Sequence, residues 1–491
     1  MWRINGFRTS LESKRAAAAS GARGAIGPSR VRQRACTALL TLTLTFSAAA
    51  LAAQSALPVL TKVQARDLMA YALRSNQTQA AAQIAQAFLS EDKSDPAAHY
   101  TMAMVYARSG NLPEARKSSR LAFRYSKSDV QSFMSADLSA RLAYQDKSLT
   151  WAQYWLRRAH TEAPDAVQQR RIEQDFKRVR TQNPFQFRID TSVAPSSNVN
   201  NGSLSRYMII DGVPVIGVNV GDAMALSGIE AMLNARLGYR LRESQTTETR
   251  AVARYFMRRV TLSDDARQTA PGARGSDYAY SLLEGGLRHA FRPSRDGPVW
   301  SVGALVGRAW YANDPSYDLA RLEGGGTWQK PGNRTFSILA KREWRRETSA
   351  PGGTDVFTGL TFGYSKKLKS GDALSTLISL NKTDDATPAF SSRGAGAQIR
   401  YTFDKPIGTV QLSTALSAGF SDYSDYRVGF IQVPGGRQDL SLSGEVELSF
   451  LNMQYAGFAP TLTFRALTTD SNVSRFDTRQ FSVNIGIRSA F

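Results

Sequence analysis

The sequence predicts an α + β multidomain protein, with an α-helical domain followed by a 14-stranded antiparallel transmembrane β-barrel. Three observations predict this fold. Residues 57–182 are rich in Ala, Leu, Gln and Arg at helical spacing. After Asn183-Pro184 the pattern changes to strict alternation of apolar and polar side chains. That alternation recurs as far as Phe491, and a period of two gives each strand one apolar face and one polar face.

Composition limits the class of protein. The chain has 491 residues, enough for two or three domains, and 42% of them are hydrophobic. Beyond the amino-terminal region no apolar run approaches the ~20 residues of a membrane helix, so a closed barrel is the remaining way to span a membrane. The net charge is +21, but the arginines are spread singly along alternating strands rather than gathered in one patch. We therefore expect no nucleic-acid partner.

Residues 1–52 have the pattern of a secretory signal. Arg30, Arg32 and Arg34 precede a short apolar stretch over residues 35–46, and small residues follow it. With a cleavage site at residues 50–52, this order predicts a cleaved signal peptide rather than a permanent anchor.

The start of this signal is unusually long. No methionine lies between Met1 and Met69, and we expect translation to begin near Val31. The only cysteine, Cys36, falls inside the signal, so the mature chain is expected to have no thiol and no disulfide.

Residues 57–182 match the spacing of a tetratricopeptide repeat (TPR), a pair of helices in which small residues mark the close helix crossings. Ala81 lies one 34-residue repeat before Ala115, and Ala152 belongs to a further copy with a short insertion. We expect a periplasmic TPR-like domain of three or four helical hairpins with a concave protein-binding surface. The best copy contains His99, Met102, Ala103, Tyr106, Gly110, Ala115 and Ala122.

One helix of this domain carries a basic stripe. Arg116, Arg120 and Arg124 recur every four residues, which places them on one helix face. They are candidate client-binding residues, although a solvated helix face is the alternative interpretation.

Residues 183–491 contain fourteen segments with strand alternation. Tight turns between them alternate with longer connections, as a membrane barrel requires. Because the helical domain is expected in the periplasm, the tight turns belong on the periplasmic side and an even strand number returns the chain there. The predicted strands are 185–193, 226–242, 246–261, 277–292, 298–312, 317–329, 334–346, 354–368, 372–383, 391–404, 407–422, 437–450, 454–469 and 475–491.

The last of these strands ends on Phe491, and its terminal pattern resembles the assembly signal of bacterial outer-membrane β-barrels. The expected location is therefore the cell outer membrane of a Gram-negative bacterium, with outer-membrane lipids around a monomeric barrel. The barrel-assembly machinery is the expected partner of the C-terminal strand.

Polar positions on the predicted strands face the lumen, which a barrel of fourteen strands leaves wet. Mixed charges across a lumen either pair with one another and hold the wall rigid, or act along a translocation path. The candidate lumen-lining residues are Arg188, Asp190, Glu230, Arg236, Arg240, Arg254, Arg258, Glu284, Arg288, Arg321, Glu323, Arg400, Glu445, Glu447 and Arg465.

Nothing in the sequence predicts catalysis. His99 and His160 belong to the helical domain, and His289 is predicted on the lipid face. No nucleophile with a positioned histidine and no metal-ligand cluster can be assembled, so we expect no catalytic residue, no metal and no cofactor.

A short motif lies where the first strand leaves the membrane. Residues 194–200 read Ala-Pro-Ser-Ser-Asn-Val-Asn, and with the domain order they resemble the surface lipoprotein assembly modulator (Slam) family. The residues that match the family-like motif are Pro195, Asn198 and Asn200. The resemblance covers residues 57–491. It implies protein transport, in which a lipoprotein or secreted client is helped across the outer membrane to the cell surface.

Two other functions fit the same architecture. One is a porin-like diffusion channel, and the other is a polysaccharide-export pore that joins TPR repeats to a barrel. Such exporters have much longer repeat arrays, which counts against the polysaccharide-export pore. Residues 201–225 are apolar enough to form a hairpin or a plug.

Overall fold

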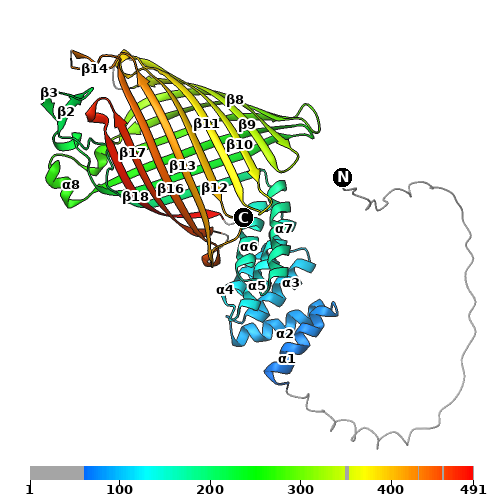
Figure 1. Ribbon diagram of the computed structural model, residues 1–491. Coiled ribbons are helices and arrows are strands. Elements are labelled where there is room, and N and C mark those ends of the chain that lie inside the picture. The colour runs from blue at the N-terminus through cyan, green and yellow to red at the C-terminus, as the bar shows by residue number, and fades with distance from the viewer. Residues whose placement is uncertain (1–59, 349–352, 430, 456–457, 490–491) are drawn as a thin grey trace, which may run out of the picture. The chain divides into compact units, whose positions relative to one another are not determined.

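The computed structural model describes residues 60–348, 353–429, 431–455 and 458–489. The predicted signal peptide, Cys36 and the terminal Phe491 lie outside these residues. Within them, helices come first and a closed barrel of fourteen antiparallel strands follows, which confirms the predicted fold class (Figure 1).

Seven helices form the described part of the first domain, and each packs against the next as an antiparallel hairpin element. Side chains fix where they start. Asp95 Oδ1 accepts a hydrogen bond of 2.9 Å from the Ala98 amide, Ser128 caps another helix, and Asp165 accepts from two amides. The helices are α1 (Lys62–Arg74), α2 (Thr78–Glu91), α3 (Pro96–Arg108), α4 (Leu112–Arg124), α5 (Asp129–Gln145), α6 (Leu149–Thr161) and α7 (Ala166–Gln182).

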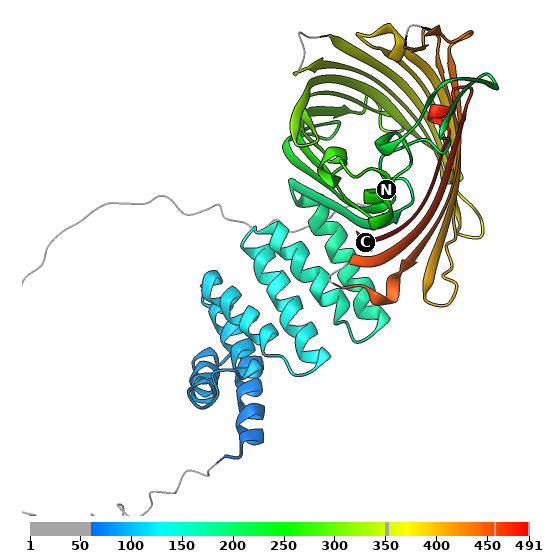
Figure 2. The ribbon, with the colours of Figure 1, turned by 90° about the vertical axis from the view of Figure 1, so that its left-hand side faces the viewer.

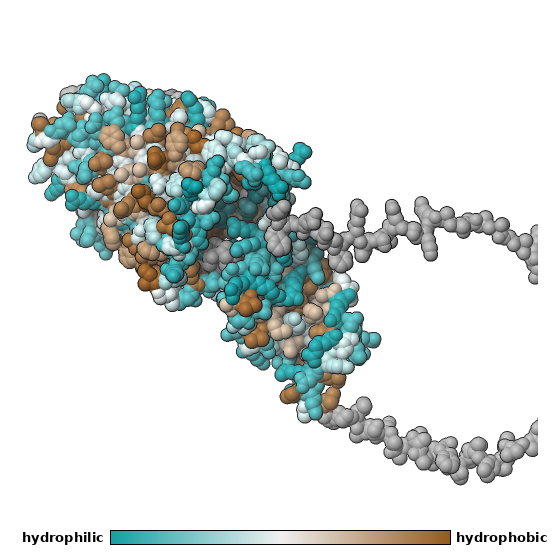
Figure 3. All heavy atoms as spheres, turned by 45° about the vertical axis from the view of Figure 1, so that its right-hand side comes forward, coloured by the Kyte–Doolittle hydropathy of each residue, from teal (hydrophilic) through white to brown (hydrophobic). Residues whose placement is uncertain are grey.

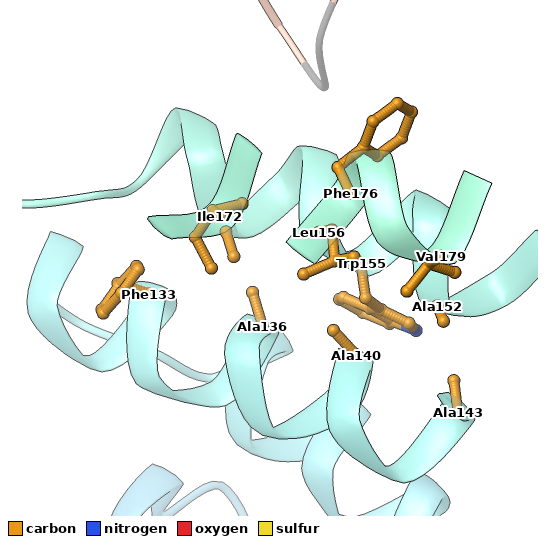
Figure 4. Close-up of a cluster of buried hydrophobic side chains, with 11 residues drawn as sticks. Phe133, Ala136, Ala140, Ala143, Ala152, Trp155, Leu156, Ile172, Phe176 and Val179 are labelled. Carbon is orange, nitrogen blue, oxygen red and sulfur yellow. The ribbon is translucent and has the colours of Figure 1, made fainter. Parts of the chain in front are cut away.

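Small residues lie where these helices cross. Ala81, Ala115 and Ala152 are fully buried, as expected for positions that let two helix backbones approach closely. Larger side chains of α5, α6 and α7, including Trp155 and Ile172, fill the space between the helices (Figure 4). None of the described helices is both long and apolar enough to cross a bilayer.

The barrel closes by pairing its first strand with its last, in the order β1-β18-β17-β16-β13-β12-β11-β10-β9-β8-β7-β6-β5-β4. Every neighbouring pair is antiparallel, and pairs such as β1–β4, β9–β10 and β13–β16 are in continuous register. The closing pair β1–β18 is shorter and is interrupted between Val193 and Ser196. The strands are β1 (Phe185–Ser196), β4 (Gly228–Glu243), β5 (Thr247–Leu262), β6 (Tyr280–Phe291), β7 (Val299–Tyr311), β8 (Asp314–Lys330), β9 (Arg334–Glu347), β10 (Thr354–Lys367), β11 (Ala373–Asp384), β12 (Ser392–Thr402), β13 (Val410–Tyr423), β16 (Arg437–Phe450), β17 (Phe458–Ser471) and β18 (Thr478–Ser489).

The two ends of the barrel differ. The turn end carries Phe185 and the short connections at residues 244–246 and 331–333, and the loop end carries the first loop, residues 197–227. One connection at the loop end departs from the predicted pattern. The sequence predicts a connection at 313–316, but Ala312 and Asn313, both with positive φ, join β7 to β8 in a two-residue turn.

Two small hairpins and several short helical segments lie at the loop end. The first loop contains the hairpin of β2 (Tyr207–Ile210) and β3 (Val213–Val218), so the apolar stretch at 201–225 folds as a hairpin. The connection between β5 and β6 contains α8 (Asp264–Thr269), and β14 (Arg427–Val428) pairs with β15 (Ile431–Gln432). Figure 2 views this end and shows these segments around the opening.

The outer face of the barrel is apolar. Large aliphatic and aromatic side chains that alternate with polar residues along each strand are exposed on it, among them Val302, Val306, Leu322, Leu416 and Ile485. Figure 3 shows hydrophobic patches on the visible barrel wall. An apolar outer face on a closed barrel is the surface that transmembrane barrels turn towards lipid.

Candidate functional site: the inner wall and the first loop

The cross-strand register places the predicted lumen-lining residues on the face of the sheet opposite the exposed apolar side chains. One row runs Arg188, Arg236, Arg254 and Glu284 across four successive strands. Arg321, Glu323, Arg400, Glu445 and Arg465 occupy the same face of their strands.

Most of these charges pair with one another. The central unit lies on β6, β8 and β9, where Arg321 bridges Glu284 at 2.9 Å and Glu343 at 2.6 Å. Arg345 donates a second hydrogen bond of 2.6 Å to Glu343, and Arg254 approaches Glu284 at 3.7 Å. Both carboxylates are buried. Glu343 accepts hydrogen bonds from Arg321 and Arg345, whereas Glu284 is held by ion-pair attraction to Arg321 and Arg254.

A glycine on β7 lets an ion pair between β6 and β8 cross the strand that lies between them. Arg288 on β6 contacts Glu323 on β8 at 2.6 Å although β7 lies between them. A Cβ at Gly303 of β7 would come within 3.0 Å of the Glu323 side chain and 3.2 Å of Arg288. The missing side chain therefore makes room for the ion pair to pass over the strand.

Separate ion pairs lie elsewhere on the inner face of the barrel. Arg258 binds Glu230 at 3.0 Å, Arg400 binds Glu445 at 2.7 Å, and Arg188 binds Asp190 on its own strand at 3.0 Å. Glu447 forms a bidentate ion pair with Arg488. Arg488 is not among the predicted lumen-lining residues.

Three arginines of the predicted set behave differently. Arg240 pairs with Glu243 at 2.8 Å and also donates to the carbonyl oxygens of Thr181 and Gln182, at the end of α7. Such contacts satisfy carbonyls that a helix end leaves without partners. Within the described residues Arg236 and Arg465 form no ion pair, which leaves them as accessible cations on the inner face.

The motif residues hold the first loop in place. Asn200 donates to the carbonyls of Asp222 and Met224, both at 2.8 Å, and accepts from the Leu226 amide at 2.9 Å. Asn198, which is almost fully buried, makes reciprocal hydrogen bonds of 2.9 Å with the backbone of Gly202. The two asparagines thus replace regular backbone pairing inside the loop.

Inner-face side chains bind the backbone of the same segment. Arg258 donates to the carbonyl oxygen of Val199, and Gln480 donates to that of Asn198 at 3.1 Å. Pro195, the third motif residue, lies in the last part of β1, where it needs no amide partner towards β18. Since Arg258 and Gln480 face the lumen, the start of the first loop lies against the inner wall near the loop end.

A second set of contacts, which we call the cap, joins the first loop to the last two. Ile210 of β2, Val433 and Val473 form a buried cluster from three separate connections. Ser203 Oγ donates to the Ser474 carbonyl at 2.8 Å, and Asn472 binds Asp211 at 3.0 Å. The guanidinium of Arg437 lies 3.6 Å from the ring centroids of both Tyr423 and Phe476, which fixes the edge of the cap.

The helical domain contributes a groove of about 590 Å³ between α1, α3 and α5. Apolar side chains line it, including Leu73, Met104 and Met134, with Arg66 and Arg108 at its margins. The arginine stripe lies elsewhere, on α4. There Arg116 is bound to Asp146 and Ser148, whereas Arg120 and Arg124 are exposed.

The histidines that the structure describes are hydrogen-bonded to other protein groups rather than gathered with acidic residues in a metal site. No group of three His, Cys, Asp or Glu side chains in them has the geometry of a metal site. His289 lies on the outward face and hydrogen-bonds Thr249 at 2.9 Å, and His99 bonds a backbone carbonyl.

No family model matches this chain, and no curated protein matches it either. Among solved structures, an outer membrane channel from Pseudomonas putida is 9% identical with a TM-score of 0.32, and the match covers 61% of this chain and 95% of that one. An anion-selective porin from Comamonas acidovorans is 12% identical with a TM-score of 0.30, over 62% of this chain and all of that one (100%).

The helical part is similar to a type III secretion translocator chaperone of Yersinia enterocolitica, SycD. That match is 15% identical with a TM-score of 0.23, over 24% of this chain and 83% of that one. Similarity at this level says nothing about substrate or partner, so the function is inferred below from the geometry of this chain.

Proposed function

We propose that this protein is an outer-membrane translocon of the Slam type, which recruits a polypeptide client on its helical domain and conducts it through or along the barrel. The observation that carries the proposal is the presence, on one chain, of a membrane-type barrel with a polar inner wall and a helical domain with an open groove. A diffusion channel has no use for a protein-binding domain.

The state of the loop end also supports a translocon. The first loop is bound to the inner wall by Arg258 and Gln480 and to the other loops through the cap. These contacts hold the first loop at the barrel opening, and in a translocon such a loop is the element that a client displaces as it leaves. The groove between α1, α3 and α5 is the proposed recruitment site, and the client is a lipoprotein or secreted protein with an extended segment that fits it.

The test compares surface display of a client with ion conductance. We expect deletion of residues 57–180 to leave a folded, heat-modifiable barrel but to reduce surface display of a small lipoprotein or secreted protein encoded beside this gene. Display is measured by whole-cell immunolabelling and protease shaving. Met134→Glu in the groove should reduce display in the full chain, and Val130→Glu, at an exposed position of the same helix outside the groove, serves as the matched control.

A diffusion channel gives the opposite result. It would show steady conductance in a planar bilayer without any client, and its solute flux would not change on deletion of the helical domain. Unchanged display together with steady open conductance would replace the translocon proposal with a porin.

A further inference from the structure

A groove lies on the outer face of the barrel, over strands β12, β13, β16, β17 and β18. Its volume is about 760 Å³, within the ~300–1,000 Å³ of small-molecule sites. It is open to the side on which the barrel meets lipid. Figure 1 shows these strands side by side.

Small outward side chains form the floor of the groove. The register brings Leu416, Gly444, Ala466 and Phe481 into one row across four neighbouring strands. Gly444 and Ala466 supply almost no side chain in the middle of that row, and a Cβ at Gly444 would meet only the Leu416 side chain, at 3.8 Å. Leu416 and Phe481 are strongly exposed on either side and form walls.

The groove has a direction. A neighbouring row runs Ala418, Leu442, Thr468 and Arg479, so the β18 end of the groove carries a guanidinium. Arg479 is one residue from the start of β18 at the loop end, whereas Leu416 and Ala418 lie in the middle of β13. The groove therefore runs from the middle of the wall, where its lining is apolar, to a cation at the loop-end rim.

Arg479 has room for an anionic ligand. Its side chain is exposed, and it forms no ion pair with any residue that the structure describes. An arginine at the edge of a membrane is stabilised when its guanidinium meets a phosphate, which accepts two parallel hydrogen bonds.

We propose that this groove is a binding site for one phosphate-bearing membrane lipid, with an acyl chain over Gly444 and Ala466 and the phosphate at Arg479. The proposal rests on the placement of the barrel in a membrane but not on its transport activity. The apolar floor fits a hydrocarbon chain, and the single cation at the rim fits the head of the same molecule.

The test is native mass spectrometry of the full-length protein released from detergent in the presence of dipalmitoyl phosphatidylglycerol or dipalmitoylglycerol. The second lipid has the same chains without the phosphate. We expect the wild-type protein to retain more phosphatidylglycerol. Arg479→Gln should lower this retention about tenfold, the size expected for the loss of a charge-assisted hydrogen bond, and should leave dipalmitoylglycerol unchanged.

A groove-filling variant tests the chain-binding part. The double substitution Ala418→Leu and Ala466→Leu adds apolar atoms at exposed outward positions, so folding is preserved, and it should lower retention of both lipids. The matched controls are Arg342→Gln and Ala340→Leu, outward positions on β9 away from the groove, which should leave retention as in wild type.

Three results would overturn the proposal. An equal loss in Arg479→Gln and Arg342→Gln would mean general attraction of lipid to surface arginines. Unchanged retention in the filled variant would mean that the groove holds no chain. A dimer in the spectra that disappears on filling would identify the groove as a contact between two copies of this chain. Surface display of a client is measured separately, so failure here leaves the proposed transport function untouched.

Discussion

Single residues decide how the inner wall is stabilised. Arg321 serves two buried carboxylates at once, Glu284 and Glu343, so its removal leaves two charges with fewer partners. Glu343 and Arg345 escaped the sequence analysis although their in-phase spacing on the strand at 334–346 was available as a signal. The passage of the Arg288–Glu323 pair over Gly303 could not be foreseen, because it depends on register between three strands.

Arg321→Met should destabilise the barrel by about 3 kcal/mol, the lower end of the range for breaking a buried ion pair. Urea unfolding in lipid vesicles, followed by tryptophan fluorescence, measures this change. Arg465→Met is the control on the same face, and because Arg465 forms no ion pair among the described residues it should change stability by less than about 0.5 kcal/mol. Equal effects of the two substitutions would contradict the bridging role of Arg321.

Asn200→Ala should loosen the first loop without unfolding the barrel. The substitution removes three hydrogen bonds of 2.8–2.9 Å to loop backbone, and an unsatisfied buried group costs about 1–3 kcal/mol. The expected result is at least ~10-fold faster protease cleavage within residues 203–225 at an unchanged unfolding midpoint. Val220→Ala, at an exposed position in the same loop, should cleave as wild type.

At the scale of elements, alternation predicted the strands well because it is a local property of the chain. All fourteen predicted strands are present, and most limits differ from the structure by a few residues. Between the predicted strands 298–312 and 317–329 the connection is shorter than the four residues left for it, because a two-residue turn with positive φ at both residues joins β7 to β8. Its residues, Ala312 and Asn313, do not form the Asn-Gly or Asp-Gly pair that normally identifies such a turn.

The face assignment of β16 is open to direct measurement. Cysteines at Leu442 and Val446 should react with a lipid-phase probe, and cysteines at Ser443 and Glu445 with an aqueous one, because the two pairs alternate along the strand. Val446→Arg should lower stability by about 2–4 kcal/mol if it lies near the bilayer midplane. A uniform labelling pattern on both faces would remove the barrel placement.

The turn between β10 and β11 is sensitive to acid. Hydrogen bonds from Ser370, from Tyr401 and from the backbone amide of Asp404 lower the pKa of Asp372 to about 2. Because the folded pKa is depressed, the stabilisation is present above the ordinary pKa near 4 and is lost as pH falls towards 2. Carboxyl carbon NMR should give a midpoint near 2 for this residue, and a midpoint near 4 would show that the hydrogen bonds are absent in solution.

At the scale of the whole molecule, the sequence predicts two domains and a transport class, but it does not predict the contacts that join the loops at the loop end. The cap brings together residues that lie far apart in the chain and carry no shared motif. The groove of the helical domain was not predicted either, because the residues that line it come from three different helices. The motif asparagines were identified from a resemblance, and only the structure gives their physical role.

Locking the cap tests whether the loops move during transport. Asp211 and Asn472 are in direct contact, so cysteines at both positions should form a disulfide, and the only native cysteine lies in the predicted signal peptide. If a client leaves through the loop end, the oxidised double variant should display little client, and a reductant should restore display. Each single cysteine variant is a control, and normal display in the oxidised form would place the exit elsewhere.

The hydrogen bond between Ser203 and Ser474 also sets an order of events during biogenesis. These residues are 271 positions apart, and Ser474 lies in the connection just before the last strand, which begins at Thr478. The contacts of the cap therefore cannot form until nearly the whole polypeptide has been inserted. Contacts between residues so far apart in the sequence also form slowly. Until then the β2–β3 hairpin remains accessible to proteases. The time at which this hairpin becomes resistant to cleavage would thus report, in a single band on a gel, the completion of the entire barrel.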